Sequence, residues 1–289
     1  MIISIASGKG GTGKTTVAVN LALSLKNIQL LDCDVEEPNA HIFLKPTIKE
    51  HLPASIPIPE IDETKCTSCG LCKDICAYHA LAVVPPGENN KGTVLVFSHL
   101  CHGCGACSIL CPKKAIREAH KEIGWVETGE ANGLAFCHGS LNIGEAMSPP
   151  LIREVKKYID LTRTVIIDAP PGTSCPVIAA VRGSDFCVLV TEPTPFGLHD
   201  LGLAVEVLRT LSIPLGVVIN RCDIGDDTVE KYCAREDIPV LMRIPFSRDI
   251  AASYSTGTPL VEKNPAFQEK FIQLYINICR EKNEADRHH

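Results

Sequence analysis

The sequence of 289 residues lacks an excess of positive charge, a long apolar stretch and a basic N-terminal leader. Lysine and arginine number 28 against 34 aspartate and glutamate residues, so there is no overall basic field to attract nucleic acid or an anionic membrane surface. No apolar run approaches the roughly 18 residues that cross a bilayer. The apolar start of the chain is too short for a signal peptide and no charged segment precedes it. We therefore expect a cytoplasmic protein that partners neither nucleic acid nor membrane.

Cysteine, in contrast, is abundant, with 15 residues. Eight of them fall between Cys66 and Cys111, and the rest are scattered. Such clustering favours metal ligation over a disulfide scaffold, and cytosolic thiols stay reduced and available to metals. A chain of 31.2 kDa with 45% hydrophobic residues can also fill a core without covalent staples.

Apolar runs of strand length alternate with segments of helical periodicity, which predicts an α/β fold with a parallel sheet covered by helices on both faces. The predicted strands are Ile2–Ala6, Ile28–Asp32, 134–138, Thr164–Asp168, Phe186–Thr191, Leu215–Asn220 and Val240–Ile244. The predicted helices are 14–25, 150–159, 199–211, 228–236 and 266 to 282. Prolines between Pro46 and Pro59 indicate a linker, and residues 124–133 are interpreted as a turn-rich ribbon.

A phosphate-binding motif, Gly8-Lys-Gly-Gly-Thr-Gly-Lys-Thr15, follows the first predicted strand and opens the first helix. Its glycines let backbone N–H groups point at phosphate oxygens, while Lys14 would reach the β- and γ-phosphates and Thr15 would bind Mg²⁺. Asp168 ends a fully apolar strand and is the expected Walker B carboxylate near that Mg²⁺. The motif predicts binding of ATP or ADP with Mg²⁺ by Gly8, Gly10, Gly11, Thr12, Gly13, Lys14, Thr15 and Thr16.

The clustered cysteines form two motifs with the spacing of bacterial ferredoxins, Cys66-x-x-Cys69-x-x-Cys72-x-x-x-Cys76 and Cys101-x-x-Cys104-x-x-Cys107-x-x-x-Cys111. In that pattern the fourth cysteine of each motif serves the other cluster. The spacing therefore predicts two [4Fe–4S] clusters, one on Cys66, Cys69, Cys72 and Cys111, the other on Cys76, Cys101, Cys104 and Cys107. Zinc, which four thiolates also bind, and a single-cluster or [3Fe–4S] form are the alternatives. The first motif departs from the pattern in having Ala77 where the second has Pro112.

The nucleotide motifs together resemble the MinD/ParA/Mrp group of deviant Walker A ATPases. The resemblance is carried by residues 8–16, 31–34, 168–173, 191–194 and 218–221, which occur in family order outside the cysteine region. It implies a nucleotide-dependent homodimer in which Lys9 crosses to the partner's phosphates. It also implies that Asp34 orients the attacking water, that Asp32 supports Mg²⁺ through its shell, and that Asn220 and the segment Arg243-Ile-Pro245 contact adenine. Arg221, next to Asn220, is counted among the nucleotide-binding residues.

A deviant Walker A ATPase interrupted by a ferredoxin-like segment resembles MinD-superfamily ATPases with an inserted ferredoxin domain. We expect an ATPase domain from residues 1–55 and 117–289, and a ferredoxin domain from residues 56–116. The leading hypothesis is an ATPase that couples a MgATP-dependent switch to electron transfer through two clusters to a redox partner protein. The alternative is an iron–sulfur or metal-cluster carrier that delivers to an acceptor protein. A spatial or partitioning switch would need a membrane helix or a DNA partner, and the sequence indicates neither.

Of the remaining cysteines, Cys187 and Cys279 lie in apolar surroundings and are predicted to be core residues. Cys175 follows the Walker B loop, where either a structural role or a redox or metal-handling role is compatible with the sequence. The terminal pair His288-His289 is assigned no function.

Overall fold

The computed structural model describes residues 1–87 and 91–287, which form two compact units. The first unit comprises Met1–Leu52, Val126–Ser140 and Ile152–His289, and the second comprises Pro53–Trp125 and Leu141–Leu151. The second unit thus takes in residues 53–55, 117–125 and 141–151, which the sequence had assigned to the ATPase domain. The terminal pair of histidines lies outside the described residues.

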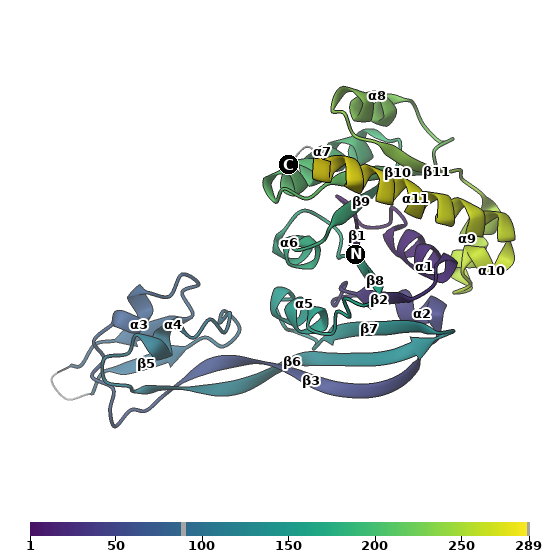
Figure 1. The fold of residues 1–289 in the computed structure, drawn as a ribbon. Coiled ribbons are helices and arrows are strands. Elements are labelled where there is room, and N and C mark those ends of the chain that lie inside the picture. Colours follow the sequence, from purple (N-terminus) through teal and green to yellow (C-terminus); the bar gives the residue numbers. More distant parts are fainter. Residues whose placement is uncertain (88–90, 288–289) are drawn as a thin grey trace. The chain divides into compact units, whose positions relative to one another are not determined.

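A nine-stranded sheet organises the chain (Figure 1). Its order is β11 (Val240–Ile244), β10 (Leu215–Asn220), β9 (Phe186–Thr191), β1 (Ile2–Ala6), β8 (Thr164–Asp168), β2 (Ile28–Asp32), β7 (Leu134–Leu141), β6 (Ile116–Ala131) and β3 (Thr47–Ile61). The strands from β11 to β7 are paired in parallel, as predicted. Because the carboxyl ends of parallel strands share one edge, the loops after β1, β2, β8 and β10 meet there.

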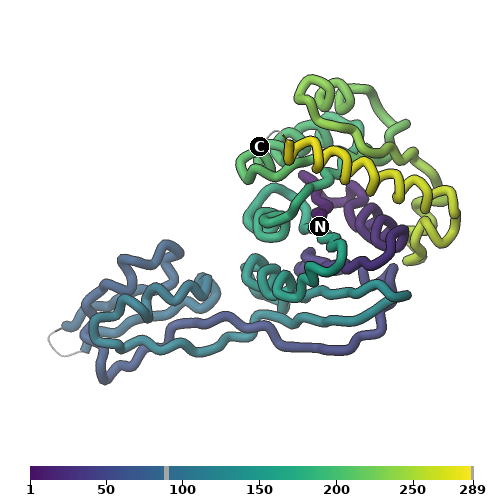
Figure 2. Tube along the Cα trace, viewed as in Figure 1, coloured from purple at the N-terminus to yellow at the C-terminus, as the bar shows by residue number. Residues whose placement is uncertain are grey.

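Helices cover both faces of this sheet. They are α1 (Lys14–Ser24), α2 (Ala40–Leu44), α5 (Pro149–Lys156), α6 (Cys175–Val181), α7 (Pro195–Thr210), α8 (Thr228–Arg235), α9 (Arg248–Ser255), α10 (Leu260–Lys263) and α11 (Pro265–Arg287). The first and last helices, α1 and α11, lie side by side on one face, as the purple and yellow tubes of Figure 2 show, and α6 and α7 lie on the other. The stripe Phe271, Leu274 and Ile278 of α11 is fully buried, so this helix is docked through one apolar face.

The predicted linker between Pro46 and Pro59 is wrong, because these residues belong to strand β3. Proline removes a backbone donor and is tolerated on an edge strand where that donor would face outward. Strand β3 is the last strand in the sheet order. Pro53, Pro57 and Pro59 lie four and two positions apart in the sequence, so their backbone nitrogens point to the same side of the strand. All three therefore leave the same side of the strand without N–H groups, which explains how a proline-rich segment forms a strand.

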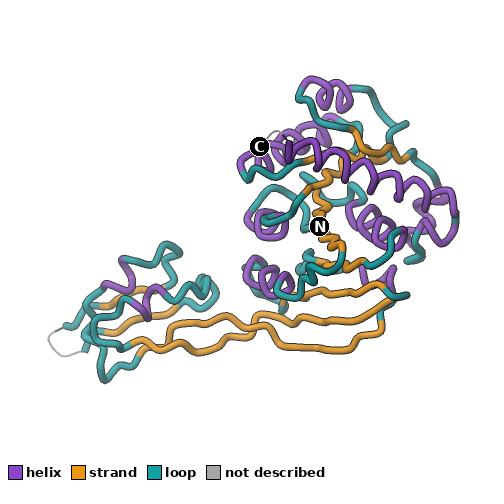
Figure 3. The backbone as a smooth tube through the Cα atoms, viewed as in Figure 1, coloured by secondary structure: helices purple, strands orange, loops and turns teal. Residues whose placement is uncertain are grey.

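The predicted ribbon over residues 124–133 is also wrong, since most of it is the end of strand β6. Asn132 and Gly133 form a two-residue connection to β7 with φ values of 50° and 80°. Two successive residues in the left-handed region are typical of a type I′ hairpin turn, so β6 runs antiparallel to β7. Figure 3 shows β6 and β3 as long continuous strands.

The second unit contains short elements around the cysteine motifs: α3 (Leu71–Asp74), β4 (Leu81–Val84), β5 (Thr93–Val96) and α4 (Ala106–Ile109). Strands β4 and β5 form a separate antiparallel pair. The two motifs repeat the same backbone, because positive φ angles occur at three matched pairs of positions: Ser68 and Gly103, Gly70 and Gly105, and His79 and Lys114. Within the described parts of the chain, no helix has both the length and the apolar character needed to cross a membrane.

Candidate functional site

The glycine-rich loop between β1 and α1 borders a cavity of about 370 Å³, a size usual for small-molecule sites. Gly13 has a φ of 96°, and an added Cβ would lie 2.6 Å from Nδ2 of Asn220. At Gly8 an added Cβ would lie 2.2 Å from the backbone oxygen of Asp200. The loop therefore adopts this path only because both positions lack a side chain.

Most of the predicted nucleotide-binding residues border this cavity. They are Gly10, Gly11, Gly13, Lys14, Thr15, Thr16, Asp34, Asn220, Arg221 and Pro245. Five other predicted residues are not among those that line it: Gly8, Lys9, Thr12, Asp32 and Asp168. Gly8 permits the close packing described above, and the backbone carbonyl of Thr12 accepts a hydrogen bond from Nδ2 of Asn220 at 2.8 Å.

Thr15 and Asp168 lie together behind the loop, with Thr15 Oγ1 donating to Asp168 Oδ2 at 2.5 Å. The other carboxylate oxygen of Asp168 is buried and accepts no hydrogen bond from the described residues. Burial raises the pKa of Asp168, while the charge of Lys14 and the bond from Thr15 act in the opposite direction. A hydroxyl beside a buried carboxylate oxygen that accepts no bond is a donor set that suits Mg²⁺.

Asp32 is fully buried opposite Asp168 on the adjacent strand. Its carboxylate accepts hydrogen bonds from the backbone N–H groups of Asp34, Asn39 and Ala40 at 2.9 to 3.0 Å. Burial, and next the charge of Asp168, raise the pKa of Asp32. Asp32 therefore fixes the loop between β2 and α2, and it adds negative charge where a cation would sit.

Asp34 leaves this loop and lines the cavity, with its carboxylate 3.9 Å from the ammonium of Lys14. Burial raises the pKa of Asp34 to about 6, and the Lys14 charge opposes that shift. The group is thus a carboxylate at neutral pH and a carboxylic acid in mild acid. Such a residue beside a phosphate-binding loop can orient a water molecule for attack.

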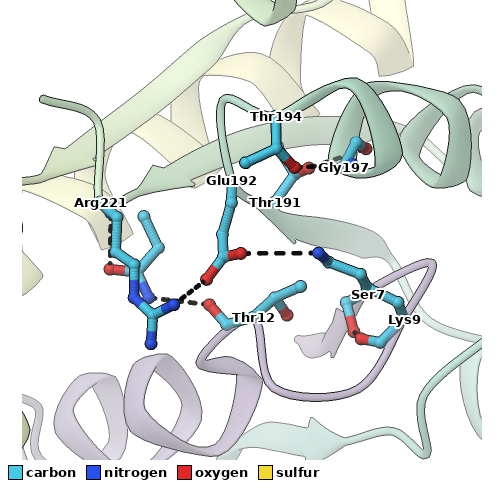
Figure 4. Close-up of polar contacts among 9 residues, drawn as sticks. Ser7, Lys9, Thr12, Thr191, Glu192, Thr194, Gly197 and Arg221 are labelled. Carbon is cyan, nitrogen blue, oxygen red and sulfur yellow. Dashed lines mark hydrogen bonds and ion pairs between the residues drawn. The ribbon is translucent and has the colours of Figure 1, made fainter. Parts of the chain in front are cut away.

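Lys9 is not among the residues that line the cavity, and its side chain points toward Glu192, which directly follows β9 (Figure 4). Its ammonium lies 3.5 Å from Oε2 of Glu192, whose other carboxylate oxygen lies 2.9 Å from the guanidinium of Arg221. Glu192 is 8% exposed. In the sequence, Glu192 is only one residue of the family segment 191–194. Nothing there indicated that its carboxylate would contact both Lys9 and Arg221.

The far end of the cavity is apolar and comes largely from a segment that the sequence did not predict. Ile244, Phe246, Ile250, Ala251 and Tyr254 line it, together with Ser247. The sequence expected the whole segment ending at Pro245 to contact adenine, but Arg243 instead bonds Glu230 at 2.6 Å.

Helix α9, which carries part of this apolar wall, had a detectable signal in the sequence. Ser247 is its N-cap and accepts a bond from the backbone of Asp249 at 3.2 Å. A serine followed by an acidic residue in the first turn is a typical helix start.

Two smaller cavities lie within the second unit, and each is lined by one of the predicted cysteine quartets. The first is lined by Cys66, Cys69, Cys72 and Cys111, with Leu71, Val94, Ile116 and Lys113 among its other residues. The second is lined by Cys76, Cys101, Cys104 and Cys107, with Tyr78, Leu81, His102 and Glu118 among its other residues. In both, three cysteines of one motif share a cavity with the fourth cysteine of the other.

Backbone N–H groups point at the sulfurs in a pattern that repeats between the motifs. The N–H of Ala80 lies 3.4 Å from Sγ of Cys76, and that of Ala115 lies 3.3 Å from Sγ of Cys111. Backbone N–H groups at this distance are typical of the hydrogen bonds that surround the sulfurs of a bound cluster. The backbone hydrogen bonds after the fourth cysteine also match: His79 N–H donates to the Cys76 carbonyl and Lys114 N–H to the Cys111 carbonyl, both at 3.1 Å. The loops therefore have the same conformation, although the first motif has Ala77 where the second has Pro112.

The polar surroundings of the two cavities differ. Lys113 lines the first cavity, whereas the equivalent position in the first motif is Tyr78, which stacks on His102 at 3.5 Å in the second cavity. The second cavity also contains Glu118, whose carboxylate accepts a bond from Ser108 at 2.7 Å. The first is thus the more positively charged of the two.

The other cysteines have mixed environments. Cys187 is fully buried, and burial raises its pKa, as expected of a core thiol. Cys279 is only half-buried, so the prediction that it is a core residue is not met in full. Cys175 is exposed at the first residue of α6.

A parallel α/β sheet with a glycine-rich phosphate loop, a Walker B carboxylate and an adjacent nucleotide-sized cavity defines a P-loop nucleotide-binding protein. The family model of the CobQ/CobB/MinD/ParA nucleotide-binding domain matches residues 3–260, and the chain belongs to this family. The chain is accordingly an ATPase of the MinD/ParA type that binds nucleotide with Mg²⁺.

Individual relatives match the chain over most of its length. An uncharacterized protein of Methanocaldococcus jannaschii is 32% identical over 278 residues, which cover 91% of this chain and 93% of the relative. An iron-sulfur cluster carrier protein of Pyrococcus horikoshii is 25% identical, with 98% of this chain and 86% of the relative covered. The structure of the septum site-determining protein MinD with Mg-ADP from Pyrococcus horikoshii superposes with a TM-score of 0.58 at 21% identity, covering 94% of this chain and 93% of that one, which shows a shared fold.

Proposed function

We propose that this chain is an ATPase with an inserted ferredoxin domain, in which a MgATP-dependent switch controls electron transfer through two [4Fe–4S] clusters to a partner protein. The observation that carries the proposal is the pair of cavities in the second unit, each lined by four cysteines drawn from both motifs. In ferredoxins with two clusters, the fourth cysteine of each motif likewise binds the cluster of the other motif. When bound, the clusters would supply one-electron redox chemistry that no side chain provides.

The donor set fits such clusters better than a single zinc ion. Within residues 1–87 and 91–287, no three histidine, cysteine, aspartate or glutamate side chains converge as one metal ion requires. Zinc needs four ligands at about 2.0 to 2.3 Å from one point. A cubane cluster is larger and its cysteine ligands are spread around it, so a quartet distributed around a cavity suits a cluster.

In the first unit, we propose that Lys14 and the loop N–H groups hold the phosphates while Thr15 and Asp168 hold Mg²⁺ and Asp32 adds charge behind it. Asp34 would orient the attacking water. The base would lie between Asn220, Arg221 and Pro245 and the apolar wall that includes Phe246 and Tyr254. Lys9 would act across a nucleotide-dependent homodimer, on the partner's phosphates.

The test is anaerobic purification followed by EPR of the dithionite-reduced protein, alone and with MgATP or MgADP. Two interacting S = 1/2 signals and about eight iron per chain are expected, with a nucleotide-dependent change in cluster potential or reduction rate. Clusters that ignore both nucleotides would rule out the coupling. Absence of iron after anaerobic reconstitution would rule out the clusters themselves.

A second candidate is an iron–sulfur cluster carrier, favoured by relatives that bear this name. It requires a labile cluster that leaves the protein, for which the exposed Cys175 beyond the Walker B loop is a candidate ligand. Transfer of iron to an apo-acceptor protein that depends on Cys175 would support it. Reconstitution that stops at about eight iron with no transfer would count against it.

A further inference from the structure

The ion pairs around Glu192 place a single buried carboxylate between two cations that belong to the nucleotide machinery (Figure 4). Arg221 lines the nucleotide cavity, and Lys9 lies within the phosphate loop. A buried carboxylate is costly to leave unpaired, so Glu192 needs at least one of the two. Its side chain is 10% exposed, against 33% for Lys9 and 49% for Arg221.

The backbone that carries Glu192 is fixed by its neighbours. The backbone N–H of Thr194 bonds the carbonyl of Glu192 at 2.8 Å, and Thr194 Oγ1 accepts from Gly197 as the N-cap of α7. A Cβ on Gly197 would lie 2.3 Å from that same carbonyl, so α7 packs directly on the loop. Thr191 also donates to the Gly197 carbonyl at 3.0 Å. The carboxylate is therefore presented from a rigid turn, while Lys9 stands on a longer and more exposed side chain.

We propose that Glu192 is a positioning residue that docks Lys9 against its own chain, away from the nucleotide cavity, until the phosphates of a second copy of this chain take the lysine over. Arg221 makes the exchange possible, because its guanidinium forms an ion pair with the other carboxylate oxygen of Glu192, 2.9 Å away, that does not involve Lys9. Removing Lys9 then leaves no unpaired buried charge. The inference rests on the proposed role of Lys9 in the homodimer. It adds that the Glu192 carboxylate competes with the partner's phosphates for Lys9.

Two substitutions should act in opposite directions. Glu192→Gln releases Lys9 and should lower the dissociation constant of the nucleotide-bound dimer by about threefold to fivefold, as expected for a partly exposed ion pair. Arg221→Gln leaves Lys9 as the remaining partner of Glu192, so docking tightens and the dimer should weaken even with every site filled by nucleotide, a condition that removes the effect of the lost Arg221 contact to the base. A merely structural role for the cluster would move both variants in the same direction.

The measurement is sedimentation velocity of the full chain with Mg²⁺ and a saturating non-hydrolysable ATP analogue, with Glu206→Gln on the exposed face of α7 as the matched control. Thermal melting identifies any variant that does not fold, and Arg221→Gln tests the proposal even if Glu192→Gln fails. Equal or weaker dimerisation in folded Glu192→Gln, or tighter dimerisation in Arg221→Gln, would overturn the docking role. If wild type dimerises and Lys9→Ala does not, the proposed function stands regardless; a wild type that stays monomeric overturns the homodimer and the docking role together.

Discussion

Replacing Cys111 with alanine should remove the cluster held by the first motif, although Cys111 belongs to the second motif. The reason is spatial, because Cys111 shares a cavity with Cys66, Cys69 and Cys72 and not with its sequence neighbour Cys107. In the proposed arrangement each quartet binds a cluster of four iron atoms, so the single variant should retain about four of about eight iron per chain.

Double variants test this ligand assignment through the iron content per chain. Cys66→Ala with Cys111→Ala damages one quartet twice and should still leave about four iron, whereas Cys101→Ala with Cys111→Ala damages both quartets and should leave almost none. Cys175→Ala is the matched control, because this cysteine lines neither cavity and should leave about eight.

Iron analysis and EPR spin counts on anaerobically reconstituted protein provide the measurement, and circular dichroism confirms that the first unit remains folded. Each cluster should be lost independently of the other if the ligand sets are separate. The opposite result for the two double variants would refute the exchange of the fourth ligand, because it would mean that every motif binds its own cluster with four consecutive cysteines.

Three further predictions concern single residues. Gly8→Ala should weaken ATP binding at least tenfold without unfolding the protein, because the new Cβ would lie 2.2 Å from the carbonyl of Asp200 and push the loop aside; calorimetry with wild-type affinity would contradict this. The ATPase rate should rise with pH around a midpoint of about 6, where Asp34 loses its proton, and Asp34→Asn should give a low, pH-independent rate; a profile that persists in the variant assigns it to another group. Lys113→Gln removes a positive charge that favours the reduced first cluster, so the ratio of reduced to oxidised cluster should fall about threefold, which lowers the reduction potential by about 28 mV for a one-electron couple. The control Lys114→Gln changes a residue that lines neither cavity and should leave the potential unchanged. Equal shifts of the two variants in a redox titration would show that the charge of Lys113 has no local effect.

The sequence predicted the parallel sheet well because its strands are buried on both faces and therefore read as continuous apolar runs. Strands such as Phe186–Thr191 have the predicted bounds. The strands that failed differ from this pattern: Thr47–Ile61 has mostly exposed residues, and Ile116–Ala131 mixes exposed, half-buried and buried ones. Their pattern resembles a loop when judged by apolar content, and β3 pairs with β6 across the intervening residues 62–115.

The phosphate loop could be predicted because its chemistry depends on consecutive residues. The apolar wall around Phe246 and Tyr254 could not, because it is brought to the loop by the order of strands β1, β9, β10 and β11. The same is true of Glu192, which meets Lys9 and Arg221 only where the ends of three strands come together. A spacing motif identifies local ligands, whereas contacts across the sheet edge depend on topology.

The crossing points of the chain bear on how ATP and the clusters could be coupled. The chain passes between the two units within β3, β6, β7 and α5. On β7, His138 stands in register with Asp32 of the nucleotide site, and its Nε2 lies 2.9 Å from Glu127 on β6. Glu127 in turn pairs with His51 on β3 at 2.9 Å. A row of side chains, His138, Glu127 and His51, therefore starts beside the strand position of Asp32 and crosses the three strands that continue into the second unit, so we expect any coupling between nucleotide and cluster to run along these strands.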